Sequence, residues 1–256
     1  MPAERDWRTA VDTAGEKPLR YMDIAFGYLS RNPRYRARFD RAMRDVGRGR
    51  LSSGAAASAL IRQWGVTMEP VADRQSRRVI AHPALSPASI ILAKPPDLLP
   101  ATSIDIEALG DIRSDLMVGD AMHIGVPDPQ GDLSLWLFTR PGRSMAVVLP
   151  FGEGLNARYA EAERLRRRLR GIGAGLPSLI VPPSRRAYFR MLFRVLDGRQ
   201  AGARSRELAA VLIDPDVRQY SAAEWSDSAE RRQIGRWTAS AFELMNGGYL
   251  RLLRGA

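Results

Sequence analysis

Apolar residues recur at helical spacing within residues 19–46, near the start of the chain. One set falls at i, i+4, i+8 and i+11, namely Tyr35, Phe39, Met43 and Val46. This spacing places their side chains on one face of a helix. Asn32-Pro33 separates this helix from an earlier apolar cluster. A short further helix runs through Trp64 and stops at Gly65. The pattern predicts a helical segment over residues 1–68.

The apolar runs become short and prolines become frequent between residues 71 and 150. Strand-sized runs occupy residues 89–93, 122–126, 133–139 and 145–149. Turn-forming residues separate the last three runs, which predicts a three-stranded antiparallel meander. Apolar side chains also occur at adjacent positions in the third run, so we expect that strand to be covered on both faces. Residues 69–150 are therefore predicted to form a small β-rich segment.

Helical spacing returns at residues 155–170, where the apolar positions are expected to face the core and the arginines solvent. Among these outward arginines we place Arg158 and Arg164. Three further helices are predicted at residues 184–197, 206–213 and about 229–245. Ser205 and Ser228 are suitable N-caps for the second and third, and Gly198 is expected to end the first.

In the first of these helices the inward side chains are expected at four positions: Tyr188, Leu192, Val195 and Leu196. The third helix carries its apolar stripe at Ile234, Trp237, Ala241 and Leu244. Residues 151–256 are thus predicted to form a carboxy-terminal helical bundle. The fold class that follows is α+β, with helical segments on either side of the meander.

The formal net charge of +11 is concentrated in one part of the chain. Residues 155–206 contain 13 basic and 3 acidic residues, and every basic residue among them is an arginine. Such a concentration is typical of a surface that binds a polyanion.

The chain lacks the residues that several classes of enzyme and metal site require. The chain has no cysteine, two histidines and only two lysines, neither in a phosphate-binding glycine-rich loop. We therefore expect that the protein is not an enzyme and binds no cofactor. No apolar stretch approaches the ~20 residues of a membrane span, and the first residues are polar. We expect a cytoplasmic protein that does not contact the membrane.

The three carboxy-terminal helices suit a helix-turn-helix module, in which the third would be the recognition helix for double-stranded DNA. Its first turns offer Arg231, Arg232, Gln233 and Arg236, and arginine and glutamine suit guanine and adenine edges. We assign base contacts to Arg232 and Arg236. The phosphate contacts are assigned to Arg231, Ser226 and Ser228. Nonspecific attraction is assigned to four other arginines: Arg185, Arg186, Arg190 and Arg204. A protein-docking helical bundle remains the alternative, because some fourteen residues separate the second and third helices.

Both ends of the chain resemble known regulators. Residues 190–198, 205–209 and 245–253 resemble a carboxy-terminal domain of proteobacterial regulators carried on integrative and conjugative elements. Asp6-Trp7-Arg8 and residues 25–35 resemble the transcriptional-regulator-like domain that often precedes it. The resemblance implies a helix-turn-helix variant in activators of element excision and transfer. It also implies small antiactivators that bind those activators.

We therefore expect a DNA-binding transcriptional activator of excision and transfer genes, with RNA polymerase as a possible partner. The alternative is an antiactivator module that sequesters a homologous regulator. A partner surface of this kind needs apolar anchors. Trp225 and Tyr220 are the large aromatic residues that no helical core stripe accounts for, and they could anchor such a partner. Trp225 could equally plug the bundle before the third helix.

Overall fold

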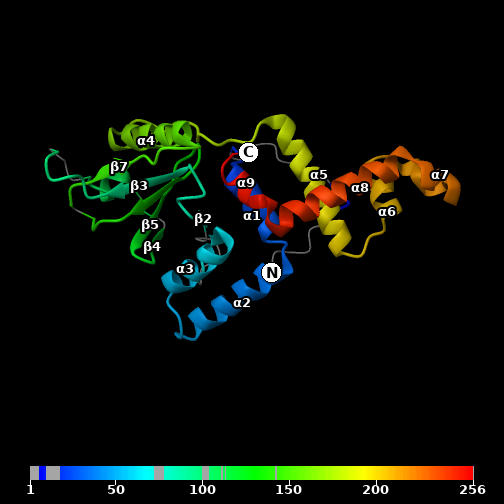
Figure 1. The fold of residues 1–256 in the computed structure, drawn as a ribbon, viewed down its shortest axis with the longest axis horizontal. Helices are drawn as coiled ribbons and strands as arrows, with labels where there is room; N and C mark the ends of the chain where they lie inside the picture. The colour runs from blue at the N-terminus through cyan, green and yellow to red at the C-terminus, as the bar shows by residue number, and fades with distance from the viewer. Residues whose placement is uncertain are drawn as a thin grey trace.

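The computed structural model describes residues 6–9, 18–71, 78–99, 104–110, 112, 114–141 and 143–255, and its fold is α+β. Figure 1 shows the strands and helix α4 at one end of the molecule and helices α5 to α8 at the other. Helices α1 and α9 lie between these two ends (Figure 1).

Short sequence signals set the bounds of the amino-terminal helices, which are α1 (Tyr21–Leu29), α2 (Pro33–Gly47) and α3 (Ser53–Trp64). The Asn32 side chain accepts hydrogen bonds from the backbone N–H groups of Arg34 and Tyr35, so it caps α2, whose first residue is Pro33. Gly65 ends α3 with a φ of +73°, a conformation that glycine adopts without strain. Both predicted boundaries are confirmed.

Seven short strands follow: β1 (Val66–Met68), β2 (Val79–Ala81), β3 (Ser89–Ala93), β4 (Ser114–Val118), β5 (Ala121–Val126), β6 (Leu133–Leu137) and β7 (Ala146–Val148). β1 and β2 form an antiparallel pair, and the other strands form one sheet in the order β4-β5-β6-β3-β7. The sheet contains an antiparallel meander, as predicted, but its members are β4, β5 and β6.

The prediction that residues 145–149 complete the meander is wrong. β7 pairs antiparallel with β3, and β3 lies between β6 and β7 and runs parallel to β6. A connection across the sheet leaves no local sequence signal, whereas the tight β4–β5 hairpin turns at Gly119, whose φ is +66°.

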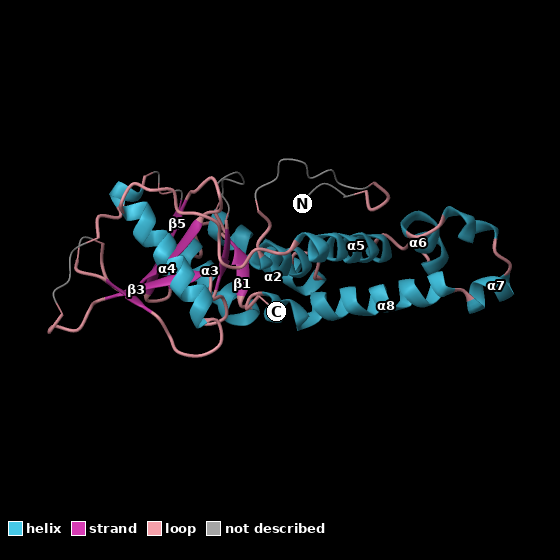
Figure 2. Cartoon of the chain, turned by 90° about the horizontal axis from the view of Figure 1, so that it is seen from above, coloured by secondary structure: helices cyan, strands magenta, loops and turns pink. Residues whose placement is uncertain are grey.

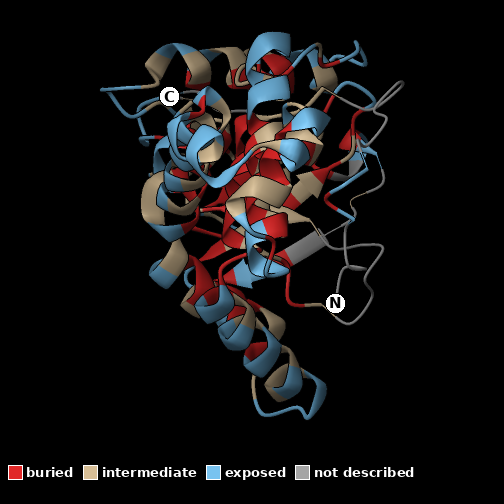
Figure 3. Ribbon diagram, turned by 90° about the vertical axis from the view of Figure 1, so that its right-hand side faces the viewer, coloured by how far each residue is buried: buried red, intermediate tan, exposed pale blue. Residues whose placement is uncertain are grey.

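Both faces of β6 are covered, as expected. On one face Leu135 and Leu137 pack in a cluster with Leu165 of α4 (Leu155–Leu169). On the other face Trp136 packs in a cluster with Ile61 of α3. Figure 3 shows the buried residues gathered around the strands and between the helices.

The prediction that Arg158 and Arg164 face solvent is wrong, because both lie on the buried side of α4, at 7% and 4% exposure. Arg158 donates to the carbonyl of Pro83 at 2.7 Å. Arg164 donates to the carbonyl of Gly175 at 3.0 Å and to the Glu161 carboxylate at 2.7 Å. These loop carbonyls need donors where water is excluded, and the guanidinium group provides several.

The carboxy-terminal helices are α5 (Pro183–Gln200), α6 (Ser205–Leu212), α7 (Ala222–Asp227), α8 (Ala229–Glu243) and α9 (Tyr249–Leu252). Helix α5 does not end at Gly198, contrary to the prediction. Gly198 is buried inside the helix, where an added Cβ would lie 2.6 Å from Leu208 and 3.0 Å from Trp7. The glycine serves close packing and not a helix end. Phe189 takes the buried position predicted for Tyr188, which is 44% exposed.

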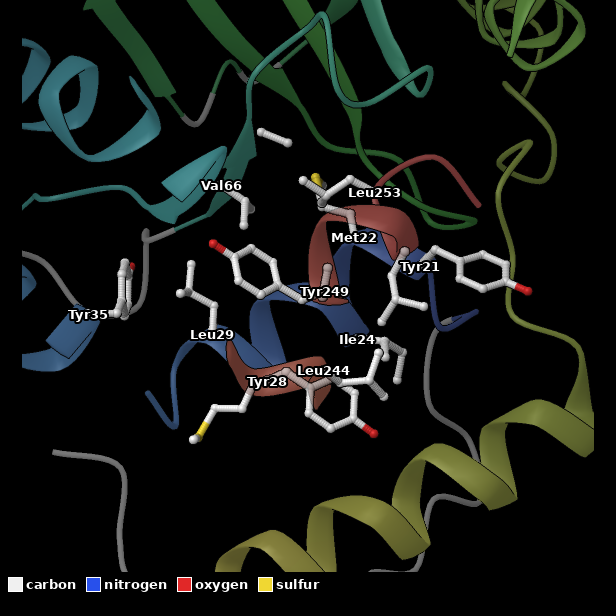
Figure 4. Close-up of a cluster of buried hydrophobic side chains, with 14 of the residues drawn as sticks. Tyr21, Met22, Ile24, Tyr28, Leu29, Tyr35, Val66, Leu244, Tyr249 and Leu253 are labelled. Carbon is white, nitrogen blue, oxygen red and sulfur yellow. The ribbon is translucent and has the colours of Figure 1, made fainter. Parts of the chain in front are cut away.

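One hydrophobic cluster joins the two ends of the chain. It unites Ile24, Tyr28 and Leu29 of α1 with Leu244 and Tyr249 near the carboxy-terminus. Figure 4 shows α1 lying directly against this carboxy-terminal segment, with Tyr249 pointing between Val66 and Leu29. The Tyr249 hydroxyl also donates to the carbonyl of Trp64 at 2.8 Å. The amino-terminal helices and α8–α9 therefore share a core.

Candidate nucleic-acid interface

Ser228 is the N-cap of helix α8, as predicted. The Ser228 hydroxyl accepts from the backbone N–H of Arg231 at 3.1 Å and donates to the carbonyl of Trp225 at 3.1 Å. The residue is only 9% exposed. Its side chain therefore works inside the cap. A phosphate contact from this hydroxyl, as assigned above, would require that the cap open.

Three arginines project from the first half of α8, and all three are exposed. Arg231 donates to the carbonyl and the hydroxyl of Ser226, each at 2.9 Å. Arg232 donates to the carbonyl of Asp227 at 2.8 Å, and Arg236 donates to the side chain of Gln233. Each guanidinium has five N–H donors, so each keeps donors for a further acceptor.

Arg232 and Arg236 are one helical turn apart, and Ala239 continues the same exposed side of α8. The positive end of the helix dipole lies at Ser228, next to this side. The half-buried Gln233 lies nearby through its hydrogen bond to Arg236. The structure thus brings together the four side chains assigned to the recognition helix and Ser226.

The opposite side of α8 is anchored in a second cluster. Ile234 is fully buried there with Leu208 and Ala209 of α6 and with Val217. Helix α6 therefore packs against the first half of α8.

The stretch between α6 and α8 is ordered helical structure and not an extended linker. It contains a 3₁₀ turn (Pro215–Gln219) and α7. Ser221 and Glu224 form a capping box at the start of α7. The S-x-x-E pattern that signals such a box was available in the sequence.

Arg206 is a positioning residue that the sequence did not single out. Its Nε donates to the carbonyl of Val217 at 3.0 Å, and its Nη2 donates to the carbonyls of Arg218 and Tyr220. One side chain of α6 thereby fixes the 3₁₀ turn and the approach to α7.

Arg185 and Arg186 lie away from this group, at the amino-terminal end of α5. Arg185 donates to the Tyr21 hydroxyl at 2.8 Å, and Arg186 donates to the carbonyl of Val181 at 2.7 Å. Eighteen residues of α5 span about 27 Å, and α6 follows at the other end. Figure 2 shows α5 and α8 side by side, with α6 and α7 at the end remote from the sheet. The structure does not bring Arg185 and Arg186 to the start of α8.

Arg190 is half-buried in the middle of α5, whereas Arg204 is exposed at the start of α6. The Arg204 side chain makes no hydrogen bond or ion pair with any residue that the structure describes. Among the four arginines assigned to nonspecific attraction, it is the one best placed to contact a phosphate beside the α6–α8 group.

The charge excess of residues 155–206 does not form one patch. The arginines of α4 lie on the helix that packs against the sheet. There Arg168 donates to the carbonyl of Leu109 at 3.1 Å, and Arg166 pairs with Glu163. Arg194 of α5 holds the amino-terminal segment through the carbonyls of Trp7 and Arg8, each at 2.8 Å. Many of these arginines satisfy backbone carbonyls, so the sequence count overstates the charge available to a polyanion.

Trp225 and Tyr220 are both half-buried and pack against the cluster that contains Val217 and Ile234. Each residue therefore keeps some exposed surface. The packing agrees with the interpretation of Trp225 as a plug of the bundle.

Three family models match consecutive parts of the chain. Residues 6–67 match the proteobacterial transcriptional regulator-like domain, and residues 88–147 match a domain of unknown function, DUF7012. Residues 148–254 match a model described as "T6SS, Transcription factor, DNA binding domain". No curated protein and no solved structure matches the chain.

The third match covers α4 to α9 and so includes the whole α6–α8 group. Together with the first match it supports a DNA-binding transcriptional regulator. Within the described part of the chain, no helix has the length and apolarity needed to cross a membrane.

Proposed function

We propose that this protein is a transcriptional activator that places α8 in the major groove of double-stranded DNA. Arg232, Gln233 and Arg236 face base edges, while Arg231, Ser226 and Arg204 hold the phosphates. The observation that carries this assignment is the exposed arginine side of α8, anchored by Ile234 on α6. It lies inside the segment that matches a DNA-binding domain. DNA binding also requires the cytoplasmic location expected from the sequence.

We propose further that its targets are the excision and transfer genes of an integrative and conjugative element, where it contacts RNA polymerase. The resemblance at both ends of the chain supports this target class. A second target class is the gene set of a type VI secretion system, which the description of the matched family favours. Sequestration of a homologous regulator is the alternative from another functional class.

Footprinting with the full-length protein on promoters of both gene sets tests these proposals. Protection of element promoters alone supports the first target class, and protection of secretion promoters alone supports the second. If neither set of promoters is protected and the protein captures a homologous regulator, the sequestering role is favoured.

Substitutions on α8 test how the DNA is read. We expect Arg232→Ala and Arg236→Ala to cost ~1–3 kcal/mol on the specific site and much less on random DNA. Arg251→Ala, an exposed arginine of α9, removes the same charge within the same matched segment and serves as the control. Equal losses for all three variants would show that α8 does not read sequence.

Salt dependence separates phosphate contacts from base contacts. Loss of one phosphate contact lowers the slope of log K against log salt by about 0.9. We expect this change for Arg204→Ala. The expectation for Arg186→Ala, placed at the far end of α5, is a smaller change.

A further inference from the structure

A cavity of about 330 Å³ lies outside the helices assigned to DNA. It is bordered by α3, by the β4–β5 turn, by the end of β6 and by the residues that follow β2. Ligand pockets usually have volumes of ~300–1,000 Å³, so the cavity has room for a small metabolite.

The wall of the cavity is largely apolar. Ile61, Val118 and Trp136 line it and are each less than 9% exposed. Phe138 also lines it but is 45% exposed, although an aromatic side chain gains free energy when it is covered. A ligand with an apolar body would bury this ring.

Two opposite charges line the same cavity. Arg62 of α3 and Asp120 of the β4–β5 turn are both exposed. Neither side chain has a hydrogen bond or ion pair with any residue in the described part of the chain. Pairing between them would neutralise the site, but they form no such pair. Both charges are thus available to a ligand.

His82 adds a neutral donor. Its Nδ1 accepts from the backbone N–H of Ala84 at 3.2 Å, which places the ring proton on Nε2. Burial lowers the pKa of His82 below its usual value, so the ring is uncharged at pH 7. The cavity therefore has one cationic group and one anionic group beside an apolar wall.

We propose that this cavity binds a small zwitterion with an apolar side chain, of the α-amino acid class. The carboxylate binds Arg62, the ammonium group binds Asp120, and the side chain packs against Ile61, Trp136 and Phe138. A simple carboxylic acid would leave Asp120 unpaired beside it, and a simple amine would leave Arg62 unpaired. The zwitterion satisfies both charges.

The cavity is connected to α8 through α3. Trp64, at the end of α3, accepts the hydrogen bond from Tyr249 of α9, and Gly65 packs closely against Leu250. A Cβ at Gly65 would lie 2.9 Å from Leu250 Cδ2. Because α9 continues from α8 through residues 244–248, a ligand that shifts α3 also shifts the helix assigned to DNA. This regulatory step rests on the proposed function, whereas the binding site does not.

Calorimetric titration of the full-length protein without DNA tests the site. The probes are L-leucine, L-phenylalanine and L-tryptophan, with phenylacetate and phenethylamine as analogues that each lack one charge. We expect at least one amino acid to bind at least tenfold more tightly than both analogues. Absence of binding by all three amino acids at millimolar concentration, or equal binding by phenylacetate, overturns the proposal.

Variants locate the binding. We expect Arg62→Ala and Asp120→Asn each to weaken the amino acid at least tenfold, with unchanged thermal midpoints. Arg48→Ala, an exposed arginine after α2, is the charge-matched control and should leave affinity unchanged. Unchanged affinity in Arg62→Ala rejects the site.

Repeating the titration with target DNA bound measures the coupling, because the change in ligand affinity must equal the change in DNA affinity. Equal affinities with and without DNA would remove the regulatory step and leave the site in place. Failure to bind DNA would overturn the proposed function without affecting the first titration.

Discussion

Arg31, just after α1, and Asp197 of α5 form a bidentate ion pair, with Nε–Oδ1 and Nη2–Oδ2 distances of 2.6 and 2.7 Å. The Arg31 side chain is 8% exposed, and its guanidinium carbon lies 4.3 Å from the centroid of the Phe193 ring. Its remaining Nη1 donates to the carbonyl of Gly27. The pair fastens the amino-terminal helices to the helix that supports the candidate DNA interface.

Removal of one partner of this pair should leave an uncompensated buried charge. We expect Arg31→Ala to lower the free energy of unfolding by ~3–5 kcal/mol, measured by urea denaturation. Arg166→Ala, which breaks the exposed pair with Glu163, is the control and should leave the midpoint nearly unchanged. Similar small changes in both variants would mean that Arg31 does not connect the two regions.

Two glycines in neighbouring helices predict opposite effects of the same substitution. Gly198→Ala places a methyl group against Leu208 and Trp7, so we expect a loss of ~1–3 kcal/mol. Gly235→Ala meets open space on the exposed side of α8 and should stabilise the protein by about 1 kcal/mol.

DNA binding should respond differently from stability in the second variant. The methyl group at position 235 stands beside Arg232 and Arg236, on the side assigned to the groove. We therefore expect Gly235→Ala to weaken specific binding while it raises the unfolding midpoint. An unchanged DNA affinity would place Gly235 outside the interface, and a lowered midpoint for this variant would contradict the packing.

The sequence predicted the features that depend on neighbours in the chain. The break at Asn32-Pro33, the Ser228 cap and the Gly65 end are confirmed, because each requires only a local side chain or a left-handed glycine. The predicted Ser205 cap is wrong, because Ser205 is the first residue of α6 and the N-cap position is Arg204, which makes no side-chain capping bond. The sequence also failed where distant segments meet. Gly198 packs against Trp7, and Arg158 reaches a carbonyl on the chain before β3, and neither partner can be inferred from local spacing.

The candidate interface divides along the same line. The exposure of Arg232 and Arg236 followed from the helical stripe of Ile234 and Ala241. The sequence did not reveal that the Ser228 hydroxyl is occupied by its capping hydrogen bond. It also did not reveal that Arg185 and Arg186 lie at the far end of α5. Those outcomes depend on how α5, α7 and α8 pack, which periodicity does not specify.

Buried His123 predicts a pH dependence of stability. Burial lowers the pKa of His123 to about 4, although a Glu69 carboxylate oxygen lies 3.7 Å from its Nδ1. An unfolded histidine has a pKa near ~6.5, so the unfolded chain binds the proton first as the pH falls. The stabilising contribution is present above about pH 6.5 and is lost towards pH 4.

Urea denaturation at pH 7 and pH 5 measures this contribution. We expect the wild-type protein to lose about 2 kcal/mol through this group between pH 7 and pH 5, because the full slope of ~1.4 kcal/mol per pH unit applies only below about pH 6.5. His123→Gln should remove that part of the slope whatever its stability at pH 7. Parallel pH profiles for the two proteins would mean that His123 is not buried in its neutral form.

Substitutions of Trp225 test whether its side chain plugs the helical bundle or anchors a partner protein. Its ring packs against the cluster around Val217 and Ile234, and its carbonyl accepts the Ser228 hydroxyl at the start of α8. We expect Trp225→Ala to destabilise the protein by about 2–3 kcal/mol, less than the ~3–5 kcal/mol of a fully buried tryptophan, because the ring is half-buried. Trp225→Phe keeps an aromatic ring in the cluster and should retain most of that stability.

A pull-down with a homologous antiactivator, run beside thermal melts of both variants, separates the two roles. Loss of capture in Trp225→Ala with an unchanged melt would identify an anchor, and Tyr220→Ala should then weaken capture too. A lowered melt in Trp225→Ala, with capture retained in Trp225→Phe, would establish the plug.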